Sequence, residues 1–226
     1  VDSHHFPLPL IPGSDVAGIR EDTGQTVVLH PGFGCLNCDT CNDGQHNLCR
    51  WYAIRGETVN GGMCERVVVP KSHIIPCSIP PEQAAALPLS LLTAWHMLVG
   101  RAKIQAGDKV LIQAGASGVG SLAIQIAKLH GAEVAITAST AKKREQCLAL
   151  GADHAWEYEV ARNEVRNWTN KRGVDIVIDH VGTNTWKSSV QSLCRGGKLV
   201  TCGATTGYTA EIDLRVLFFK QLNLLG

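Results

Sequence analysis

Four cysteines near the N-terminal end of the sequence form its strongest chemical pattern. Cys35, Cys38, Cys41 and Cys49 lie within fifteen residues of chain. Four thiolates satisfy a tetrahedral Zn²⁺ ion and leave no open coordination position. The spacing therefore predicts a structural zinc site, with an iron–sulfur cluster as the alternative. A zinc ribbon that binds nucleic acid would need a basic face, and residues 34–48 contain no Lys or Arg.

A second pattern is the glycine-rich segment at residues 114–120, which reads Ala-Gly-Ala-Ser-Gly-Val-Gly. It follows an apolar run and leads directly into an amphipathic segment. Backbone N–H groups at such a turn can hold a pyrophosphate, and the dipole of the following helix favours its charge. Ser117 stands where the usual fingerprint has its middle glycine, so an ordinary tight turn is the alternative. The segment predicts a dinucleotide site.

The end of the next apolar run indicates which dinucleotide is bound. Folds that bind NAD commonly place an acid there, which accepts hydrogen bonds from the adenosine ribose. Residues 137–144 contain no acid and end in Lys142, Lys143 and Arg144. Cations without an acid suit the 2′-phosphate of NADP(H). The sequence favours NADP(H) over NAD(H), and the alternative is that these bases form a solvated first turn of a helix.

The elements that must position these residues differ between the two halves of the chain. Residues 1–80 are punctuated by Gly and Pro and predict small antiparallel β-structure, with strands at 26–29, 65–69 and 73–75. From residue 81 onward, predicted strands and helices alternate. Strands are predicted at 109–113, 133–137, 154–156, 174–178, 198–202 and 222–225, and helices at 81–98, 118–129, 141–150, 160–170 and 185–194. Apolar strands separated by helices indicate an α/β fold, with a doubly wound parallel sheet covered on both faces.

Composition excludes several classes of partner. A formal net charge of +1 does not suit binding to nucleic acid, and no apolar run is long enough to cross a bilayer. An odd number of cysteines, nine, with one tight cluster, fits metal binding in a reducing compartment, so we expect the cytoplasm. The chain starts without Met and stops inside a predicted strand, so we expect a fragment that lacks both ends of a longer protein.

Together these motifs resemble the medium-chain dehydrogenase/reductase family. The resemblance lies in the glycine-rich segment 12–18, the cysteine loop 34–49, the glycine pair at 61–62, the hinge 84–95 with its Leu-Thr-Ala-Trp, and the turn 179–182. It implies a partial GroES-like catalytic lobe at residues 1–85, with a structural zinc loop at 35–49. It also implies a Rossmann NAD(P)-binding domain at residues 86–226, truncated at its C-terminus.

Two positions depart from the zinc alcohol dehydrogenases of that family. Their catalytic zinc takes a His from a Gly-His-Glu motif and a Cys from the hinge, and the corresponding residues here are Ser14 and Leu89. A hydroxyl is a poor zinc ligand and a leucine is none. In this respect the chain resembles the zinc-independent quinone and enoyl reductases, although those usually lack the four-cysteine loop. The short hairpin at 18–26 is a further departure, because the family normally has a longer stretch there.

The resemblance implies an NADP(H)-dependent oxidoreductase that transfers hydride to or from a carbonyl, enone or quinone of a small-molecule substrate, without a catalytic zinc. The alternatives are a zinc-dependent alcohol dehydrogenase with an atypical catalytic site, and a non-enzymatic cofactor-binding protein. It also implies a homo-oligomer in the full-length protein.

The resemblance further implies which residues line the cofactor. Lys143 and Tyr158 belong to the 2′-phosphate and adenosine end, and Val181 and Gly203 to the nicotinamide end. The proton donor is not identified; His180, at a strand end, is a candidate, and a structural role is its alternative. The full cofactor-lining set comprises Thr93, Gly115, Ala116, Ser117, Gly118, Val119, Ser139, Lys143, Tyr158, Val181, Gly203 and Ala204.

Overall fold

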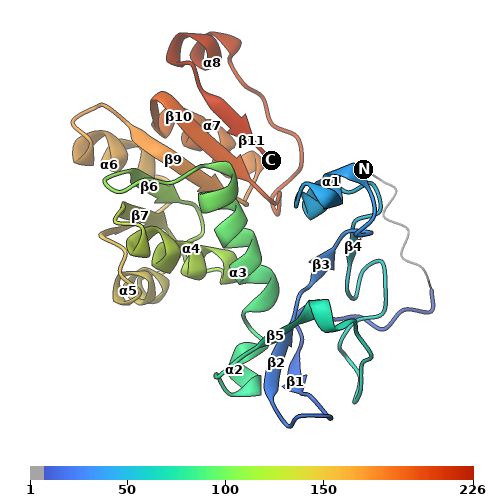
Figure 1. Ribbon diagram of the computed structural model, residues 1–226. Coiled ribbons are helices and arrows are strands. Elements are labelled where there is room, and N and C mark those ends of the chain that lie inside the picture. The colour runs from blue at the N-terminus through green and yellow to red at the C-terminus, as the bar shows by residue number, and fades with distance from the viewer. Residues whose placement is uncertain (1–7) are drawn as a thin grey trace. The chain divides into compact units, whose positions relative to one another are not determined.

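The computed structural model describes residues 8–226, and the chain divides into two compact units, Val1–Ser90 and Leu91–Gly226. Figure 1 shows the elements of both units in chain order. We refer to them as the first and the second unit. None of the helices in the described part of the chain has the length and apolar character needed to span a membrane.

The first unit is built from short antiparallel strands and turns. Strands β1 (Ala17–Ile19), β2 (Thr26–Leu29) and β5 (Ile74–Pro76) form one sheet in the order β1-β2-β5, and β3 (Gly32–Phe33) pairs with β4 (Ala53–Ile54). Its helices are α1 (Asp39–Asn42) and α2 (Pro81–Ala84), and His46–Leu48 and Lys71–His73 are 3₁₀ turns. β2 buries every second side chain, Val27 and Leu29, as expected of a strand with one covered face.

The second unit contains one parallel sheet of six strands. These are β6 (Lys109–Ile112), β7 (Glu133–Thr137), β8 (His154–Trp156), β9 (Val174–Asp179), β10 (Leu193–Thr201) and β11 (Asn223–Leu225). Their order in the sheet is β11-β10-β9-β6-β7-β8, and every pairing is parallel. The chain therefore builds outward from β6 to β8 and then crosses to β9 on the other side of β6, which confirms the predicted doubly wound sheet.

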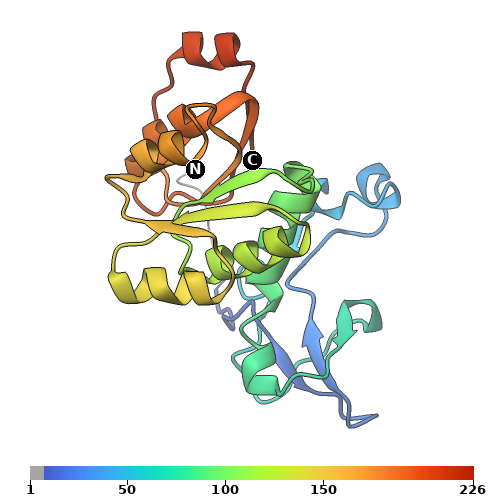
Figure 2. The ribbon, with the colours of Figure 1, turned by 90° about the vertical axis from the view of Figure 1, so that its left-hand side faces the viewer.

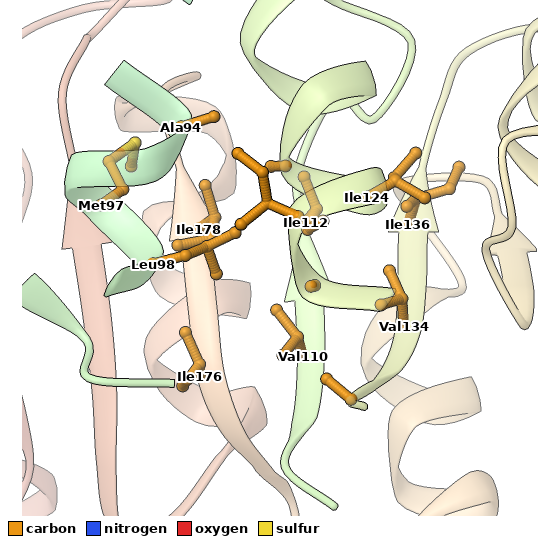
Figure 3. Packing of buried hydrophobic residues seen from close by; sticks show 14 of the residues in the cluster. Ala94, Met97, Leu98, Val110, Ile112, Ile124, Val134, Ile136, Ile176 and Ile178 are labelled. Carbon is orange, nitrogen blue, oxygen red and sulfur yellow. The ribbon is translucent and has the colours of Figure 1, made fainter. Parts of the chain in front are cut away.

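Helices cover both faces of this sheet (Figure 2). They are α3 (Pro88–Trp95), α4 (Gly118–Leu129), α5 (Ala141–Ala149), α6 (Ala161–Trp168), α7 (Thr183–Ser192) and α8 (Leu214–Lys220). Alternate strand residues point to opposite faces. Val110 and Ile112 pack with α3, α4 and α5 on one face, and Leu111 packs with α6 and α7 on the other. Figure 3 shows the first of these cores, where Leu98 meets Ile178 beside Ile112.

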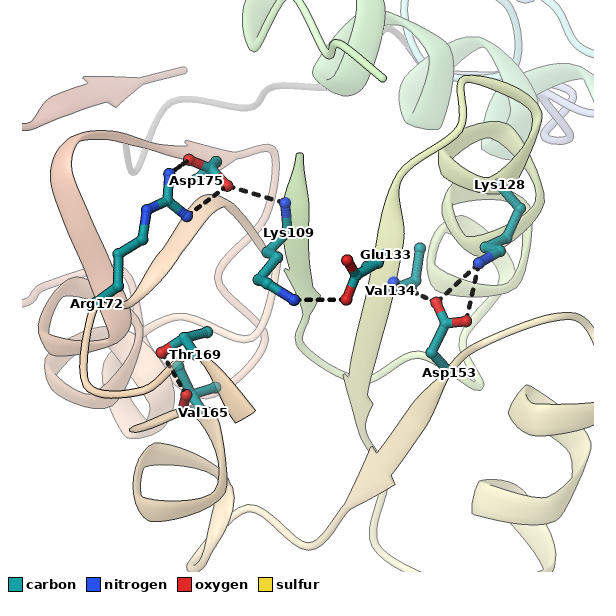
Figure 4. A network of polar contacts seen from close by, with 9 residues as sticks. All are labelled: Lys109, Lys128, Glu133, Val134, Asp153, Val165, Thr169, Arg172 and Asp175. Atoms are coloured by element: carbon teal, nitrogen blue, oxygen red, sulfur yellow. Dashed lines mark hydrogen bonds and ion pairs between the residues drawn. The ribbon is translucent and has the colours of Figure 1, made fainter. Parts of the chain in front are cut away.

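Ion pairs and backbone bonds fix the amino ends of the central strands (Figure 4). Lys109 Nζ lies 2.5 Å from Glu133 Oε2, and the Asp175 carboxylate accepts the Lys109 backbone N–H at 2.9 Å. Asp153 accepts the Val134 N–H at 2.7 Å and pairs with Lys128. These contacts hold the edge of the sheet that lies opposite the carboxyl ends of the strands.

Three sequence-based expectations about elements were wrong. The predicted strand at 65–69 has no ladder partner, and Val68 is 98% exposed. The helix predicted at 81–98 is divided into α2, α3 and a π-helical turn His96–Arg101, because Pro88 lacks the N–H that would continue α2. The helix predicted at 185–194 ends at Ser192, since Leu193 already pairs with Val174 at the start of β10. In addition, α8 was not predicted.

Candidate nucleotide-binding and metal sites

The structure brings the four cysteines of the first unit together. Their Sγ atoms all lie within 4.8 Å of one another. The Sγ atoms of Cys38 and Cys49 are 3.7 Å apart, close to the edge of about 3.8 Å expected for a tetrahedron with Zn–S bonds of about 2.3 Å. Cys41 and Cys49 are buried, and none of the four forms a disulfide. Among residues 8–226, no other group of three or more His, Cys, Asp or Glu side chains converges in this way.

The surroundings of two of the cysteines, Cys38 and Cys49, favour the thiolate. Cys49 Sγ accepts the backbone N–H groups of Cys35 at 3.4 Å and Trp51 at 3.3 Å. The Thr40 hydroxyl, 3.1 Å from Cys38 Sγ, lowers the pKa of that thiol to about 6, whereas burial raises the pKa of Cys41 to about 11. Four converging sulfur donors, one of which accepts two backbone N–H groups, fit a closed tetrahedral zinc site.

In the second unit, the glycine-rich turn connects β6 to α4. Ser117 is the N-cap of α4, and its Oγ accepts the backbone N–H of Gly120 at 3.0 Å. A Cβ at Gly115 would lie 2.7 Å from Ile136 Cβ, and a Cβ at Gly120 would lie 2.5 Å from the carbonyl oxygen of Ala114. The turn can be this tight only because both residues lack a side chain. A pyrophosphate site at this helix N-terminus stays a prediction from the sequence.

A pocket of about 130 Å³ lies beside this turn. Of the twelve residues predicted to line a cofactor, five surround it, together with Ala114 and Ala138, which the prediction missed. Both are small residues next to predicted ones, at the ends of β6 and β7. The lining residues are Ala114, Ala116, Ser117, Ala138, Ser139, Lys143 and Tyr158.

Only one of the three bases at 142–144 lines the pocket. Arg144 donates to the carbonyl oxygen of Ala138 at 3.1 Å and pairs with the Glu157 carboxylate at 2.9 Å. Its charge is therefore already neutralised, while Lys143 is exposed at the pocket. Burial raises the pKa of the Tyr158 phenol, so that side chain is a neutral hydrogen-bonding group at physiological pH.

A second group of predicted residues meets at the carboxyl ends of β9 and β10. A Cβ at Gly203 would lie 3.5 Å from the Cβ of His180. A Cβ at Gly182 would lie 2.9 Å from Ala204 Cα. The carbonyl oxygen of Val181 accepts hydrogen bonds from Thr206, which tie the segment after β10 to this turn.

His180 links the two groups. Its Nε2 lies 2.9 Å from Ser117 Oγ. Ser117 Oγ accepts from Gly120 with one lone pair, so toward Nε2 it offers both its hydrogen and a second lone pair, and the contact is compatible with either neutral tautomer of the ring. His180 Nδ1 is buried and has no hydrogen-bond partner among residues 8–226. Burial lowers the pKa of His180, so the ring is neutral at physiological pH.

The remaining predicted residues lie outside this pocket. Thr93 is in α3, Gly115 is inside the turn, and Gly118 and Val119 open α4. Two larger cavities, of about 410 and 470 Å³, lie along α7 and include none of the predicted residues.

In the first unit, Asp15 Oδ1 accepts the Leu89 backbone N–H at 2.7 Å. This carboxylate thus connects the segment containing Ser14 with Leu89, the two positions where zinc alcohol dehydrogenases carry catalytic ligands.

Comparisons with known proteins agree with both units. Residues 2–81 match the family model described as alcohol dehydrogenase GroES-like domain, and residues 118–226 match the one described as zinc-binding dehydrogenase. A probable quinone oxidoreductase of Schizosaccharomyces pombe is 33% identical over 97% of this chain. The chain spans 62% of that relative's length and 57% of the length of other curated relatives that it matches.

Two solved structures are similar over nearly the whole chain. An NAD-dependent alcohol dehydrogenase is 38% identical with a TM-score of 0.92, covering 98% of this chain and 68% of its own. A 2-octenoyl-CoA carboxylase reductase, solved in complex with NADP and 2-octenoyl-CoA, is 31% identical with a TM-score of 0.87, covering 96% of this chain and 56% of its own.

A GroES-like unit with a cysteine loop, followed by a Rossmann unit with a glycine-rich turn, defines a protein of the dehydrogenase and reductase class. Both units match models of that class, and relatives above 30% identity cover the chain from end to end. The chain belongs to the medium-chain dehydrogenase/reductase family.

Proposed function

We propose that the protein is an NADP(H)-dependent oxidoreductase that transfers hydride to or from a carbonyl, enone or quinone, without a catalytic zinc. The observation that carries this proposal is the pocket beside the glycine turn, where Lys143 is the charged lining residue and no carboxylate takes part. Two acids flank Tyr158: Glu157 is paired with Arg144, and neither Glu157 nor Glu159 lines the pocket. A 2′-phosphate would therefore meet a cation rather than a negative charge.

Different groups of residues bind different parts of the nucleotide. Amides of the turn at 115–120 and the α4 N-terminus hold the pyrophosphate. Ser139, Lys143 and Tyr158 hold the adenosine end, and Val181, Gly203 and Ala204 hold the nicotinamide end. Thr93 is assigned to the cofactor lining by its family position. The bound nucleotide supplies or accepts the hydride, and the protein orients it and keeps water away.

The substrate class follows from how the charge on oxygen is stabilised. Neither Ser14 nor Leu89 is an adequate zinc ligand, so hydrogen-bond donors must stabilise the developing oxyanion. Delocalised charge, as in an enone or a quinone, needs less stabilisation than the charge of a simple alkoxide. The similarity to a quinone oxidoreductase and to an enoyl-CoA carboxylase reductase that binds NADP supports this choice. His180, which follows β9 and whose Nε2 meets Ser117, is the candidate proton or hydrogen-bond donor.

A zinc-dependent alcohol dehydrogenase is the second candidate, because the chain is 38% identical to a solved alcohol dehydrogenase. Metal analysis of the full-length protein separates the two. One zinc per chain, held by Cys35, Cys38, Cys41 and Cys49, is expected for the reductase, and two would contradict it. If the protein binds NADPH tightly but reduces no member of a panel of quinones, enones and aldehydes, a non-enzymatic binding role is supported instead.

Replacing Lys143 by Ala should weaken NADPH binding by about tenfold to a hundredfold, because a hydrogen bond to a charged group contributes about 1.5–3 kcal/mol. NADH binding should change less than twofold, since NADH lacks the 2′-phosphate. Fluorescence titration with both nucleotides measures this.

Lys142→Ala is the matched control for Lys143→Ala. It removes the same charge one residue away, from a side chain that does not line the pocket. We expect it to leave both affinities close to those of the wild type. Equal losses of NADPH and NADH affinity in Lys143→Ala would contradict the assignment of Lys143 to the 2′-phosphate.

A further inference from the structure

Ala114, the first residue of the glycine-rich turn, has a backbone conformation that its side chain disfavours. Its φ is +51°, in the left-handed region. A residue other than glycine persists there only when its surroundings hold it. Two hydrogen bonds to Thr137 do so. The Ala114 N–H donates to Thr137 Oγ1 at 3.1 Å, and the Gly115 N–H donates to the Thr137 carbonyl oxygen at 2.9 Å.

Thr137 in turn begins a chain of buried side-chain hydrogen bonds. Its hydroxyl donates to Gln113 Oε1 at 2.6 Å, and Gln113 Nε2 donates to Ser189 Oγ at 3.0 Å. Ser189 donates to Asp179 Oδ2 at 2.6 Å. All four side chains are at most 1% exposed. Each hydroxyl accepts one hydrogen bond and donates one within the chain, so every link has a single direction.

At its other end, this series of hydrogen bonds holds a second turn through Asp179. Asp179 Oδ1 accepts the backbone N–H groups of Val181 at 2.9 Å and Gly182 at 3.1 Å. The Thr185 hydroxyl also donates to this carboxylate. This is the β9–α7 turn, which carries Val181, one of the residues assigned above to the nicotinamide end of the nucleotide. One continuous set of hydrogen bonds therefore reaches from the glycine turn to the β9–α7 turn, through β6, β7 and α7.

We propose that Thr137, Gln113, Ser189 and Asp179 position these two turns for the nucleotide, with Thr137 as the link to the glycine turn. This inference rests on the nucleotide site of the proposed function. All four side chains are closed off from solvent, so they are positioning residues and not residues that touch the nucleotide. Apolar side chains could fill the same space without the cost of burying polar groups. A buried series of polar side chains in which every hydrogen bond is made instead specifies one arrangement of the surrounding backbone.

The test compares two substitutions at one position. Thr137→Val keeps the shape of the side chain but removes the hydroxyl, which breaks its bonds to Ala114 and Gln113. We expect the Kd for NADPH to rise about tenfold, since each lost hydrogen bond contributes a factor of roughly three to ten. Thr137→Ser retains the hydroxyl and should bind NADPH within about twofold of the wild type. Fluorescence titration of the intact protein gives each Kd.

A matched pair on α7 separates positioning from general stability. Ser189→Ala breaks the chain, whereas Ser192→Ala removes another buried hydroxyl that bonds only to the Ser188 carbonyl oxygen, at 2.8 Å. Ser189→Ala should lower the melting temperature more than Ser192→Ala, because it deprives both the buried Gln113 amide and the buried Asp179 carboxylate of a hydrogen bond. Only Ser189→Ala should raise the Kd for NADPH, by about threefold.

Unchanged affinity in both Thr137→Val and Ser189→Ala would overturn the inference, as would equal weakening by Thr137→Val and Thr137→Ser. If the wild type itself binds no NADPH, the proposed function fails. The positioning role of the four hydrogen-bonded side chains is then tested by amide hydrogen exchange instead. Thr137→Val should then accelerate exchange at Ala114 and Gly115, and Ser189→Ala at Val181 and Gly182. Exchange rates unchanged from the wild type would overturn the positioning role independently of any ligand.

Discussion

Replacing Cys41 by Ser should unfold the first unit and abolish zinc binding. Of the described buried hydrophobic residues, five belong to the first unit and thirty-one to the second, and two of those five are Cys41 and Cys49. A unit with so small an apolar core depends on its metal for stability. Zinc binding in small zinc domains contributes about 10–16 kcal/mol at pH 7. Metal analysis combined with thermal unfolding measures both effects, and a strong chelator should reproduce them in the wild type.

Cys64→Ser provides the control. Cys64 lies in the same unit and is exposed, and its Sγ bonds only to backbone carbonyl oxygens. We expect its zinc content and melting temperature to match those of the wild type. A Cys41→Ser protein that melts like the wild type, or a wild type isolated without any metal, would show that the cluster does not hold the unit together.

Replacing Gly120 by Ala should disrupt the nucleotide turn. Ala is the better helix former by about 1 kcal/mol, which alone would favour the change. The new Cβ would lie 2.5 Å from the Ala114 carbonyl oxygen and 2.8 Å from Gly115 Cα, and both are backbone atoms. Overpacking against groups that cannot rotate away costs about 1–3 kcal/mol, so the clash prevails. We expect a lower free energy of unfolding and an NADPH affinity reduced by about tenfold or more.

Gly18→Ala tests whether any added methyl group has this effect. No atom lies within 4 Å of the position where its Cβ would be, and its φ is not positive. Both stability and NADPH affinity should remain near the wild-type values. Calorimetry of the two variants measures their stability, and fluorescence titration measures their NADPH affinity. Normal NADPH binding by Gly120→Ala would contradict the expected clash between a Cβ at this position and the backbone of the turn.

The central sheet could be predicted from the sequence because its signals are local. The strand cores at 110–112 and 176–178 are continuous apolar runs, and all of these residues are at most 1% exposed. Such runs occur where a strand is covered on both faces. The cysteine spacing and the glycine turn are local as well, since each lies within a short stretch of chain.

Features that depend on distant partners could not be predicted in this way. The run at 65–69 has the composition of a strand, but nothing in it specifies a neighbouring strand. In α8, which reads Leu-Arg-Val-Leu-Phe-Phe-Lys, apolar residues occupy five of seven positions and lie on every side of the helix, so no apolar face contrasts with a polar one.

The details of the candidate site were hidden for the same reason. Arg144 is paired with Glu157, thirteen residues later, so a count of nearby bases overstates the free positive charge. The bonds from Thr137 to Gln113 and from Gln113 to Ser189 join residues 24 and 76 positions apart. Composition and periodicity do not encode such pairings.

The crossing of the chain from β8 to β9 has a consequence for how the protein is made. The two turns assigned to the nucleotide are more than sixty residues apart along the chain, yet β6 and β9 are adjacent strands. A nascent polypeptide therefore has no complete dinucleotide cleft until β9 has emerged and paired, however early the glycine turn is synthesised. A nucleotide would then bind only molecules in which β9 has paired with β6. Its binding would shift late folding intermediates toward the native state by mass action.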